Sequence, residues 1–499
     1  MIGQSRRILF VVYKLNQANF IPLGLASLIG MLQANGHDVH LICPQQDNLG
    51  AEMEAFHPEV VGYSVLTGSH SQYLEMNHHL KKRYEFLSLF GGPHPTFFPE
   101  MIEEDGVDAV CIGEGELALV DFLNRLGTDD LIRTENFWVK QKDIIYRNPV
   151  RPLSQRLDDF PLPNYEIFYQ NFQNFWENPI KHFLVSRGCP YDCTYCFNHS
   201  YSQIYQDKGK RVRHKSPAYV VKEIKSVIER FPAECIYFRD DIFVASNAWL
   251  DEFTPMYKRE IGLPFICQLR VEMVNEPLIK RLILAGCVSI SLGLETGNEN
   301  FRREILNRVM SNEQVLEACK IIKQEGLPFC INNMVGLPGE TLENLYETLA
   351  LTQKIKPSYS WFQIFQPYPK TPLAEYACTQ ELFNGDYDRV YQSCHEKTAL
   401  RFPKKQQRIV NNSHKLFALA VEWPWLSGLV KWLITLPENI IYITLFAVGQ
   451  YYYTTSRLFP MLKMTTGDWI RGFWRTILVT QPSLNKPKPE LITGHNLAP

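Results

Sequence analysis

Short apolar runs alternate with longer amphipathic segments through the first 125 residues of the chain. In residues 22–35 the leucines and isoleucine recur at helical spacing, which predicts a helix that ends at Gly36. Strands that alternate with helices predict parallel βαβ units in a doubly wound sheet, with a ligand at the carboxyl ends of the strands. The apolar runs have the length of buried strands and fall at residues 8–13, 39–43, 60–65, 86–90 and 109–112.

The same alternation returns between about residues 181 and 375. Its strands are predicted at 183–185, 235–238, 265–269, 288–292, 329–335 and 361–365. Polar residues or glycines follow several of these strands. Because the carboxyl ends of the strands form the catalytic face of a β/α barrel, we expect these residues to share one site. They are Asp240 and Asp241, Arg270, Glu295 and Gly336.

Three cysteines lie close together directly after the run at residues 183–185, with the spacing C-x3-C-x2-C. A [4Fe–4S] cluster normally has four cysteine ligands, so Cys189, Cys193 and Cys196 would leave one iron open for chemistry. The alternative is a zinc site, which would need a fourth ligand, and His199 is the nearest candidate. The spacing favours the cluster.

Composition and charge bear on three further properties: nucleic-acid binding, disulfide content and cellular location. The 51 basic and 53 acidic side chains give a net charge of -2, which predicts no nucleic-acid partner. The cysteines outside the triad are scattered singly, which favours free buried thiols over disulfides. The first apolar run is too short for a signal peptide, so we expect a cytoplasmic protein in which reduced thiols persist.

Gly188 precedes the cysteine triad, and the aromatic residues Tyr195 and Phe197 flank its last cysteine. This motif resembles the signature of the radical S-adenosylmethionine (SAM) superfamily. The resemblance implies a partial (β/α)6 barrel over residues 181–375, whose open iron binds the amino and carboxylate groups of SAM. It also implies that an electron from the cluster cleaves SAM to a 5′-deoxyadenosyl radical.

The same resemblance assigns roles to the residues that follow the barrel strands. Asp240 or Asp241 corresponds to the motif that contacts the SAM amino group, and Arg270 could pair with its carboxylate. Ser291 and Glu295 match the strand that contacts the ribose. The segment around Gly336 matches the one that approaches adenine.

In the first 130 residues, the sequence Ser64-Val65-Leu66 follows the third strand and Gly91-Gly92 follows the fourth. Glycines at a strand end let the backbone approach a bulky ligand. The pair of motifs resembles the cobalamin-binding domain, as do residues 92–96 and 113–116. Many such domains carry a histidine after the first strand, but residues 14–20 contain none. His70 and His94 lie in later loops, and we expect neither to ligate cobalt.

We therefore predict a cobalamin-binding domain at 1–130, a proline-interrupted linker at 131–180, a radical SAM barrel at 181–375, a helical C-terminal domain at 376–480 and a disordered tail at 481–499. The aromatic stretch at 423–453 is repeatedly broken by charge or proline. It would either cover the barrel mouth or lie on a membrane surface, and the covering role is favoured.

The chain thus resembles the cobalamin-dependent radical SAM proteins, a group that includes class B methyltransferases and the anaerobic magnesium-protoporphyrin ester cyclases. The leading expectation is methylation of an unactivated carbon in a small or lipid-like metabolite, with a flavodoxin or ferredoxin as electron donor and a peripheral membrane contact as a further option. Alternatives are cyclisation or rearrangement without methyl transfer, methylthiotransfer, and a non-catalytic cofactor sensor. Methylthiotransferases carry three N-terminal cysteines, whereas this region has only Cys43 and Cys111.

Overall fold

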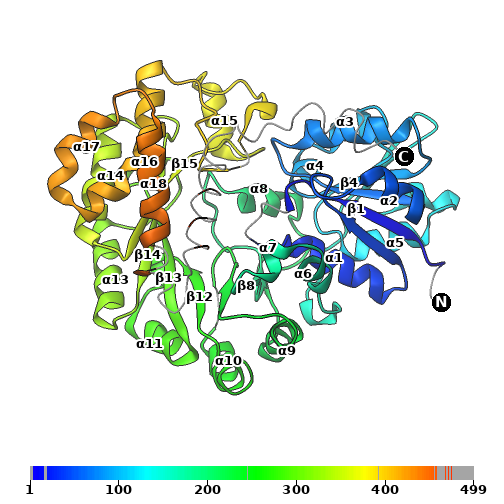
Figure 1. Ribbon diagram of the computed structural model, residues 1–499, viewed down its shortest axis with the longest axis horizontal. Coiled ribbons are helices and arrows are strands. Elements are labelled where there is room, and N and C mark those ends of the chain that lie inside the picture. The colour runs from blue at the N-terminus through cyan, green and yellow to red at the C-terminus, as the bar shows by residue number, and fades with distance from the viewer. Residues whose placement is uncertain are drawn as a thin grey trace.

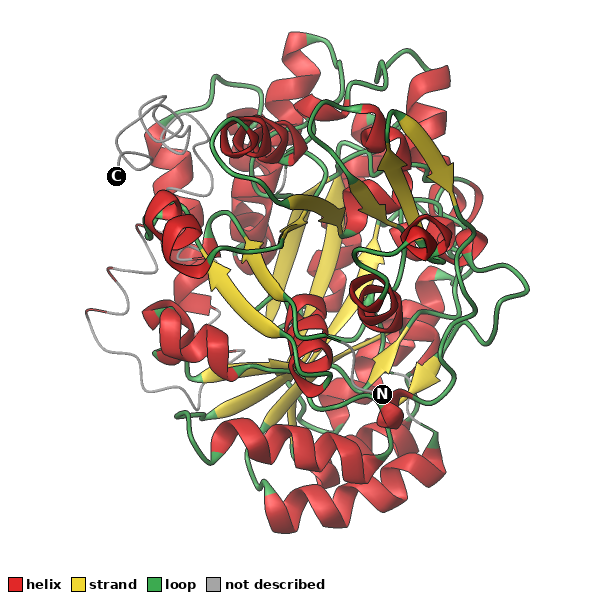
Figure 2. Ribbon diagram, turned by 90° about the vertical axis from the view of Figure 1, so that its right-hand side faces the viewer, coloured by secondary structure: helices red, strands yellow, loops and turns green. Residues whose placement is uncertain are grey.

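A computed structural model describes residues 4–453 except 16–19, 244–245 and 392, together with residues 456, 457, 467, 470 and 474. Two sheets of mainly parallel strands lie side by side, the first on the right and the second on the left in Figure 1. Helices surround the strands of both (Figure 2). The predicted tail at 481–499 lies outside the described residues.

The first sheet has seven strands in the order β2-β1-β3-β4-β5-β6-β7, of which β1 to β5 run parallel. Alternate residues of β1 face different cores: Ile8 and Phe10 face one and Leu9 and Val11 the other, as a sheet covered on both faces requires. The strands are β1 Arg7–Val11, β2 Asp38–Ile42, β3 Val60–Ser64, β4 Leu87–Gly91 and β5 Ala109–Cys111. The helices are α1 Leu23–Ala34, α2 Leu49–Phe56, α3 His70–Lys81, α4 Pro93–Phe97, η2 Pro99–Glu103 and α5 Glu116–Asn124.

The predicted linker at 131–180 adds an antiparallel hairpin to this sheet, formed by β6 (Phe137–Gln141) and β7 (Ile144–Arg147). Its two-residue turn, Lys142 and Asp143, has positive φ at both positions, the conformation of a type I′ hairpin. The rest of the segment forms η3 Asp129–Arg133, η4 Leu157–Asp159, α6 Glu166–Asn171 and α7 Gln173–Trp176.

The second sheet has six parallel strands in the order β15-β14-β13-β12-β11-β8, which form the predicted half-barrel. Helices α9, α10, α11, α13 and α14 each begin at a side-chain cap. The strands are β8 Ile180–Phe183, β11 Cys235–Phe238, β12 Phe265–Leu269, β13 Cys287–Glu295, β14 Phe329–Val335 and β15 Tyr359–Ile364. The helices are α8 Phe197–Ile204, α9 Pro217–Ile228, α10 Asn247–Glu260, η5 Val271–Met273, α11 Glu276–Ala285, α12 Glu299–Glu304, α13 Asn312–Gln324 and α14 Leu342–Ile355. The doubly wound sheet and the half-barrel are both confirmed.

The C-terminal region is helical, as predicted. Helix α16 packs against the edge strand β15 and against α14, and α17 and α18 pack against α16. Each of α17 and α18 buries one side, as at Val430 and Tyr442, and exposes large apolar residues on the other. The covering role over the barrel mouth stays a prediction. No helix among the described residues has the length and hydropathy to cross a bilayer. These elements are α15 Pro372–Thr379, η6 Tyr387–Arg389, α16 Lys404–Glu422, η7 Pro424–Leu426, α17 Ser427–Leu433 and α18 Ile440–Tyr453.

Candidate active site

The cysteine loop joins the two-residue strand β9 (Ser186–Arg187) to α8. Strand β9 pairs with β10 (Arg213–His214), which brings the residues just before β10 against the loop. Gly188 has a φ of +83°, and a Cβ there would collide with the backbone carbonyl oxygen of Arg211. Only glycine fits this start of the loop, because a side chain would be both strained and in collision.

The thiols of Cys189 and Cys193 are buried and that of Cys196 is half-buried. Burial raises the pKa of the Cys196 thiol to about 12 and also raises that of Cys189. The Arg270 guanidinium donates to Cys193 Sγ at 3.1 Å and lies 3.7 Å from the ring centroid of Tyr191. Arg270 is therefore positioned to donate a hydrogen bond to a metal-bound sulfur of Cys193.

Among the described residues, no three His, Cys, Asp or Glu side chains gather closely enough to hold a single metal ion. A closed zinc site would need such a gathering. A [4Fe–4S] cluster instead takes each thiolate at a separate iron, so its ligands surround a larger space. The chemistry of this donor set, three thiols on one loop with the guanidinium of Arg270 beside them, fits the cluster.

A buried polar network holds the middle of the loop. The Tyr195 hydroxyl donates to Glu295 Oε1 at 3.0 Å, and Arg308 Nη1 lies 2.9 Å from the Tyr195 oxygen and 3.1 Å from Glu295 Oε1. Arg308 also donates to the carbonyl oxygen of Gly293 at 2.6 Å. Glu295, predicted to contact ribose, therefore fastens the residue between Cys193 and Cys196 to the end of β13.

The two candidate aspartates after β11 have different surroundings. Asp240 is buried and accepts from the backbone N–H groups of Val185 at 3.1 Å and Ser186 at 2.6 Å. Burial nevertheless raises the pKa of Asp240 to about 6. Asp241 is exposed and lines the cavity between the two sheets together with Asn198. Asp240 thus holds the approach to the cysteine loop, and Asp241 is the one open to a ligand.

The remaining barrel residues also have protein partners. Ser291 accepts from Asn332 Nδ2 at 2.7 Å. Gly336 has a φ of +75°, and its N–H donates to Glu340 Oε2 at 2.7 Å. Burial raises the pKa of Glu340 to about 8. Arg270 binds Glu272 as well as Cys193, so its guanidinium is already engaged where the sequence suggested a SAM carboxylate.

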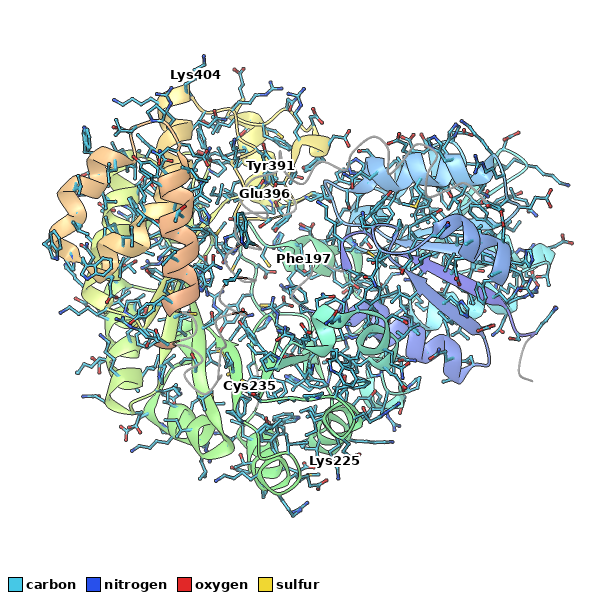
Figure 3. The ribbon with its side chains drawn as sticks, in the orientation of Figure 1. Phe197, Lys225, Cys235, Tyr391, Glu396 and Lys404 are labelled. Atoms are coloured by element: carbon cyan, nitrogen blue, oxygen red, sulfur yellow. The ribbon has the colours of Figure 1, made fainter. Side chains whose placement is uncertain are left out.

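A cavity of about 580 Å³ lies between the first sheet and the cysteine loop. Ser64, Leu66, Gly91 and Gly92, the four residues predicted to bind cobalamin, all line it. Its other side includes Gly188, Phe197, Asn198 and Asp241, and Figure 3 shows Phe197 between the two halves of the molecule.

The first-sheet side of this cavity is built from closely approaching backbone. Gly92 has a φ of +98°, and a Cβ there would lie 3.0 Å from the amide nitrogen of Val65. Gly113 has a φ of +77°, and its Cβ would collide with the Tyr205 hydroxyl. Glycine is therefore required at both positions, because the chain passes so close to Val65 and Tyr205 that a side chain would displace this wall of the cavity. A wall of closely packed backbone beside a large cavity fits a bulky corrin.

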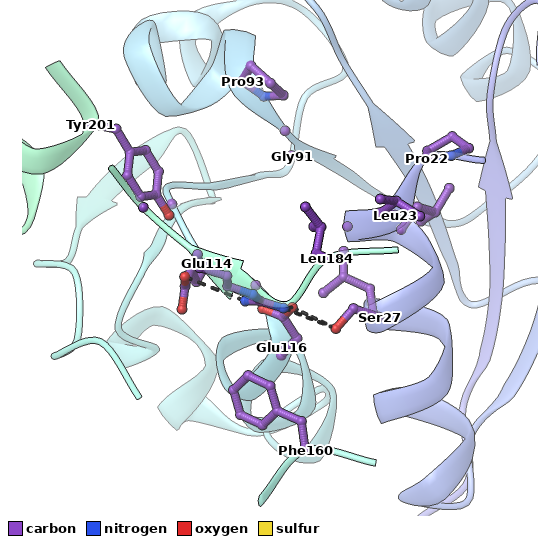
Figure 4. A pocket seen from close by; sticks show the side chains of 18 of the residues that line it. Pro22, Leu23, Ser27, Gly91, Pro93, Glu114, Glu116, Phe160, Leu184 and Tyr201 are labelled. Atoms are coloured by element: carbon purple, nitrogen blue, oxygen red, sulfur yellow. Dashed lines mark hydrogen bonds and ion pairs between the residues drawn. The ribbon is translucent and has the colours of Figure 1, made fainter. Parts of the chain in front are cut away.

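Ion pairs cross from the first sheet to the barrel at the edge of the cavity (Figure 4). Arg187, directly before Gly188, pairs with Glu116, which also accepts from Ser27 Oγ at 2.8 Å. Arg213 Nη1 donates to Glu114 Oε2 at 3.0 Å. The sequence motif contained both glutamates but gave no sign of their arginine partners.

His70 and His94 are not among the residues that line the cavity. Their rings stack with centroids 4.0 Å apart, and His70 Nε2 lies 2.8 Å from Asp388 Oδ1. Burial lowers the pKa of His94 to about 3, so its ring is neutral at ordinary pH. Through Asp388, His70 contacts the segment after the barrel, whereas His94 contacts Thr67, His70 and Phe98 of the first half.

Comparison with known families agrees with this geometry. The model of the radical SAM superfamily matches residues 183–352, and that of the B12 binding domain matches residues 16–123. An uncharacterized methyltransferase of Pyrococcus horikoshii is 29% identical over 371 residues, which are 72% of this chain and 79% of that protein. The anaerobic magnesium-protoporphyrin IX monomethyl ester cyclase of Rubrivivax gelatinosus is 22% identical over 422 residues, which cover 80% and 74% of the two chains.

A similar fold is known from a solved structure. The radical SAM methyltransferase TsrM from Kitasatospora setae, with cobalamin and a [4Fe–4S] cluster bound, matches with a TM-score of 0.66 and 16% identity. The match covers 95% of this chain and 98% of that one. At this identity the likeness concerns the arrangement of all three regions rather than the substrate.

Proposed function

Because the chain is a B12-binding radical SAM protein related to class B methyltransferases and anaerobic magnesium-protoporphyrin cyclases, we propose that it methylates an unactivated carbon of a small or lipid-like metabolite. Its cofactors are a [4Fe–4S] cluster, SAM and cobalamin. When bound, the cluster and SAM supply a radical that removes a hydrogen atom, and cobalamin supplies the methyl group. The observation that carries the proposal is the cavity lined by both cofactor regions.

On the barrel side, the thiols of the loop would hold the cluster, and the protein's task is to fix their positions. The proposed ligands are Cys189, Cys193 and Cys196. Arg270 would hold the Cys193 thiolate, and the Arg308–Tyr195–Glu295 network would hold the loop between the last two cysteines. Preorganised donors of this kind cost no rearrangement when charge develops.

Asp241 is assigned to the SAM amino group, because its carboxylate opens into the cavity while that of Asp240 accepts from backbone amides. On the opposite side, Gly91 and Gly92 would let a corrin approach the backbone, with Ser64 and Leu66 beside it. In this proposal the two cofactors would face each other across one cavity.

Labelled SAM provides the test. Anaerobically reconstituted protein, reduced by a flavodoxin or by dithionite, is incubated with methyl-deuterated SAM and cob(I)alamin. The proposal expects 5′-deoxyadenosine, S-adenosylhomocysteine and the label on bound cobalamin. Absence of label on cobalamin, with 5′-deoxyadenosine still formed, would remove the methyltransferase assignment.

A matched pair of glycine variants tests whether the side of the cavity formed by Gly91 and Gly92 binds cobalamin. Gly92→Ala should weaken cobalamin binding, since its Cβ would meet the Val65 backbone. Gly106→Ala is the control, because Gly106 also has a positive φ, lies in the same domain and does not line the cavity. Both variants should keep the cluster, and equal cobalamin affinity in both would contradict the assignment.

Cyclisation or rearrangement without methyl transfer is the second candidate, supported by the similarity to the Rubrivivax gelatinosus cyclase over 80% of the chain. It predicts SAM cleavage that depends on bound cobalamin, with no methyl label in any product.

A further inference from the structure

Helix α17 and the 3-10 turn η7 before it expose large apolar side chains on one face. Trp425, Leu429 and Trp432 are 79%, 50% and 57% exposed, and their spacing of four and then three residues sets them on the same side of a helix. The opposite side packs inward through Val430, which is buried. Single exposed apolar residues are common on protein surfaces, but a row of large ones on one helical face is typical of an interaction surface.

Helix α18 repeats the arrangement. Its inner side buries Tyr442 and Phe446 against the C-terminal core, and Phe446 lies 4.5 Å from the ring of His414 in α16. Its outer side carries an exposed row at the same spacing of four and three, made of Ile441, Leu445, Val448 and Tyr452. Two consecutive helices that pack on the same helix α16 are therefore apolar on their outer sides as well as on their inner ones.

The acidic side chains of this region are already paired. Between residues 420 and 457 the carboxylates are Glu422, which pairs with Arg457, and Glu438, which pairs with the buried Lys415. Lys431 of α17 extends its ammonium group over the ring of Tyr346 at 4.3 Å. Residues 420–453, 456 and 457 therefore contain no acidic side chain that lacks a basic partner, and Lys431 and Arg457 are the basic residues of this stretch.

We propose that the outer face of α17 and α18 is a membrane-docking surface that lies on an anionic lipid bilayer. Three of the chain's nine tryptophans fall within residues 423–432. Tryptophan concentrates at the boundary between lipid headgroups and acyl chains, and a helix with apolar and basic groups binds there in the plane of the membrane. The helices are too short to span, which leaves docking on the surface.

The position of α17 suits this role. It lies at the edge of the molecule farthest from the first sheet (Figure 1), so docking through it would leave the cavity between the sheets unobstructed. A bilayer at this face would also present lipid-like molecules to the barrel half of the protein. The inference concerns where the enzyme works and does not depend on which reaction it performs.

Vesicle flotation of the full-length protein tests the surface. The protein is mixed with vesicles of phosphatidylcholine alone and of phosphatidylcholine with phosphatidylglycerol. We expect flotation with both and a higher bound fraction with the anionic lipid, because electrostatic attraction adds to apolar burial. The double variant Trp425→Ser, Trp432→Ser should lower vesicle partitioning by about tenfold or more, since each exposed indole contributes burial.

Leu284→Ser is the matched control, because Leu284 is a similarly exposed apolar residue on α11 of the barrel wall. It should leave partitioning unchanged, and all variants should keep SAM cleavage in detergent-free solution, which separates this inference from the proposed reaction. Three results would overturn it: no flotation of the wild type, equal flotation of the tryptophan variant, or a wild-type dimer that the tryptophan substitutions dissociate. The last would assign the face to a second copy of the chain.

Discussion

Gly188 provides the sharpest test of how the cysteine loop is built. Replacing it with alanine adds one methyl group at a φ of +83°, where that methyl would collide with the Arg211 carbonyl oxygen. Arg211 lies two residues before β10, and its guanidinium donates to Asp192 Oδ1 at 2.6 Å and to the carbonyl oxygen of Tyr191, so its backbone is held on both sides of the loop. The strain must therefore appear in the loop that carries the three cysteines.

The free-energy cost of Gly188→Ala has two parts. An alanine at left-handed φ costs about 1 to 2 kcal/mol relative to glycine. Forcing a methyl into occupied space adds about 1 to 3 kcal/mol. Gly262→Ala isolates the first part, because Gly262 has a φ of +66° and its Cβ would lie at an ordinary 3.5 Å from the Lys258 carbonyl oxygen. The difference between the two variants measures the collision.

The assay is iron content per chain after anaerobic reconstitution, together with the free energy of unfolding in urea. Gly188→Ala should lose most of its iron. Its free energy of unfolding should fall by about 2 to 5 kcal/mol if the strain is shared with the whole fold, and by less if the loop opens locally. Gly262→Ala should keep its iron. Equal iron content in the two variants would refute the argument that the backbone of Arg211 defines the loop.

Three more outcomes follow from the site. Replacing the three loop cysteines together with alanine should abolish iron binding, and a variant that still holds a full cluster would contradict their role. The pKa of Glu340 rises on folding from 4.5 to about 8, so the free energy of unfolding should fall as pH rises through that window. In urea unfolding, Glu340→Gln should therefore be more stable than the wild type at pH 8 but not at pH 4.5. His70→Ala and His94→Ala should each leave the paramagnetic resonance spectrum of bound cob(II)alamin unchanged, because neither histidine lines the cavity. Loss of nitrogen coupling to cobalt in either variant would show that its histidine is a cobalt ligand.

The parallel strands were predictable because each is a short apolar run followed by an amphipathic segment, a signal contained within a few residues. The hairpin β6–β7 was not. Its turn residues Lys142 and Asp143 both adopt positive φ, and without a glycine the single aspartate is only a weak turn signal. Tertiary pairing with β5 supplies what the local sequence does not.

The residues of the candidate site also divide into those that the sequence predicts and those that only the fold brings together. The cysteine loop and the glycines at the end of β4 are local motifs, so the sequence was enough to find them. Arg308 and Arg187 were missed because their partners, Tyr195 and Glu116, lie far away along the chain and meet them only through the fold. Arg270 was found, yet its contact with a thiol could not be read from its position after β12.

One peptide bond separates the ion pair of Arg187 from the glycine that opens the cysteine loop. On one side, Arg187 is anchored to Glu116 of the cobalamin-binding half, and on the other the chain turns at Gly188 into the thiols. A change that moves either half must therefore be felt by the other, and such coupling is reciprocal. Loading the protein with cobalamin should raise the midpoint denaturant concentration at which the cluster is lost, and assembling the cluster should lower the equilibrium dissociation constant of cobalamin.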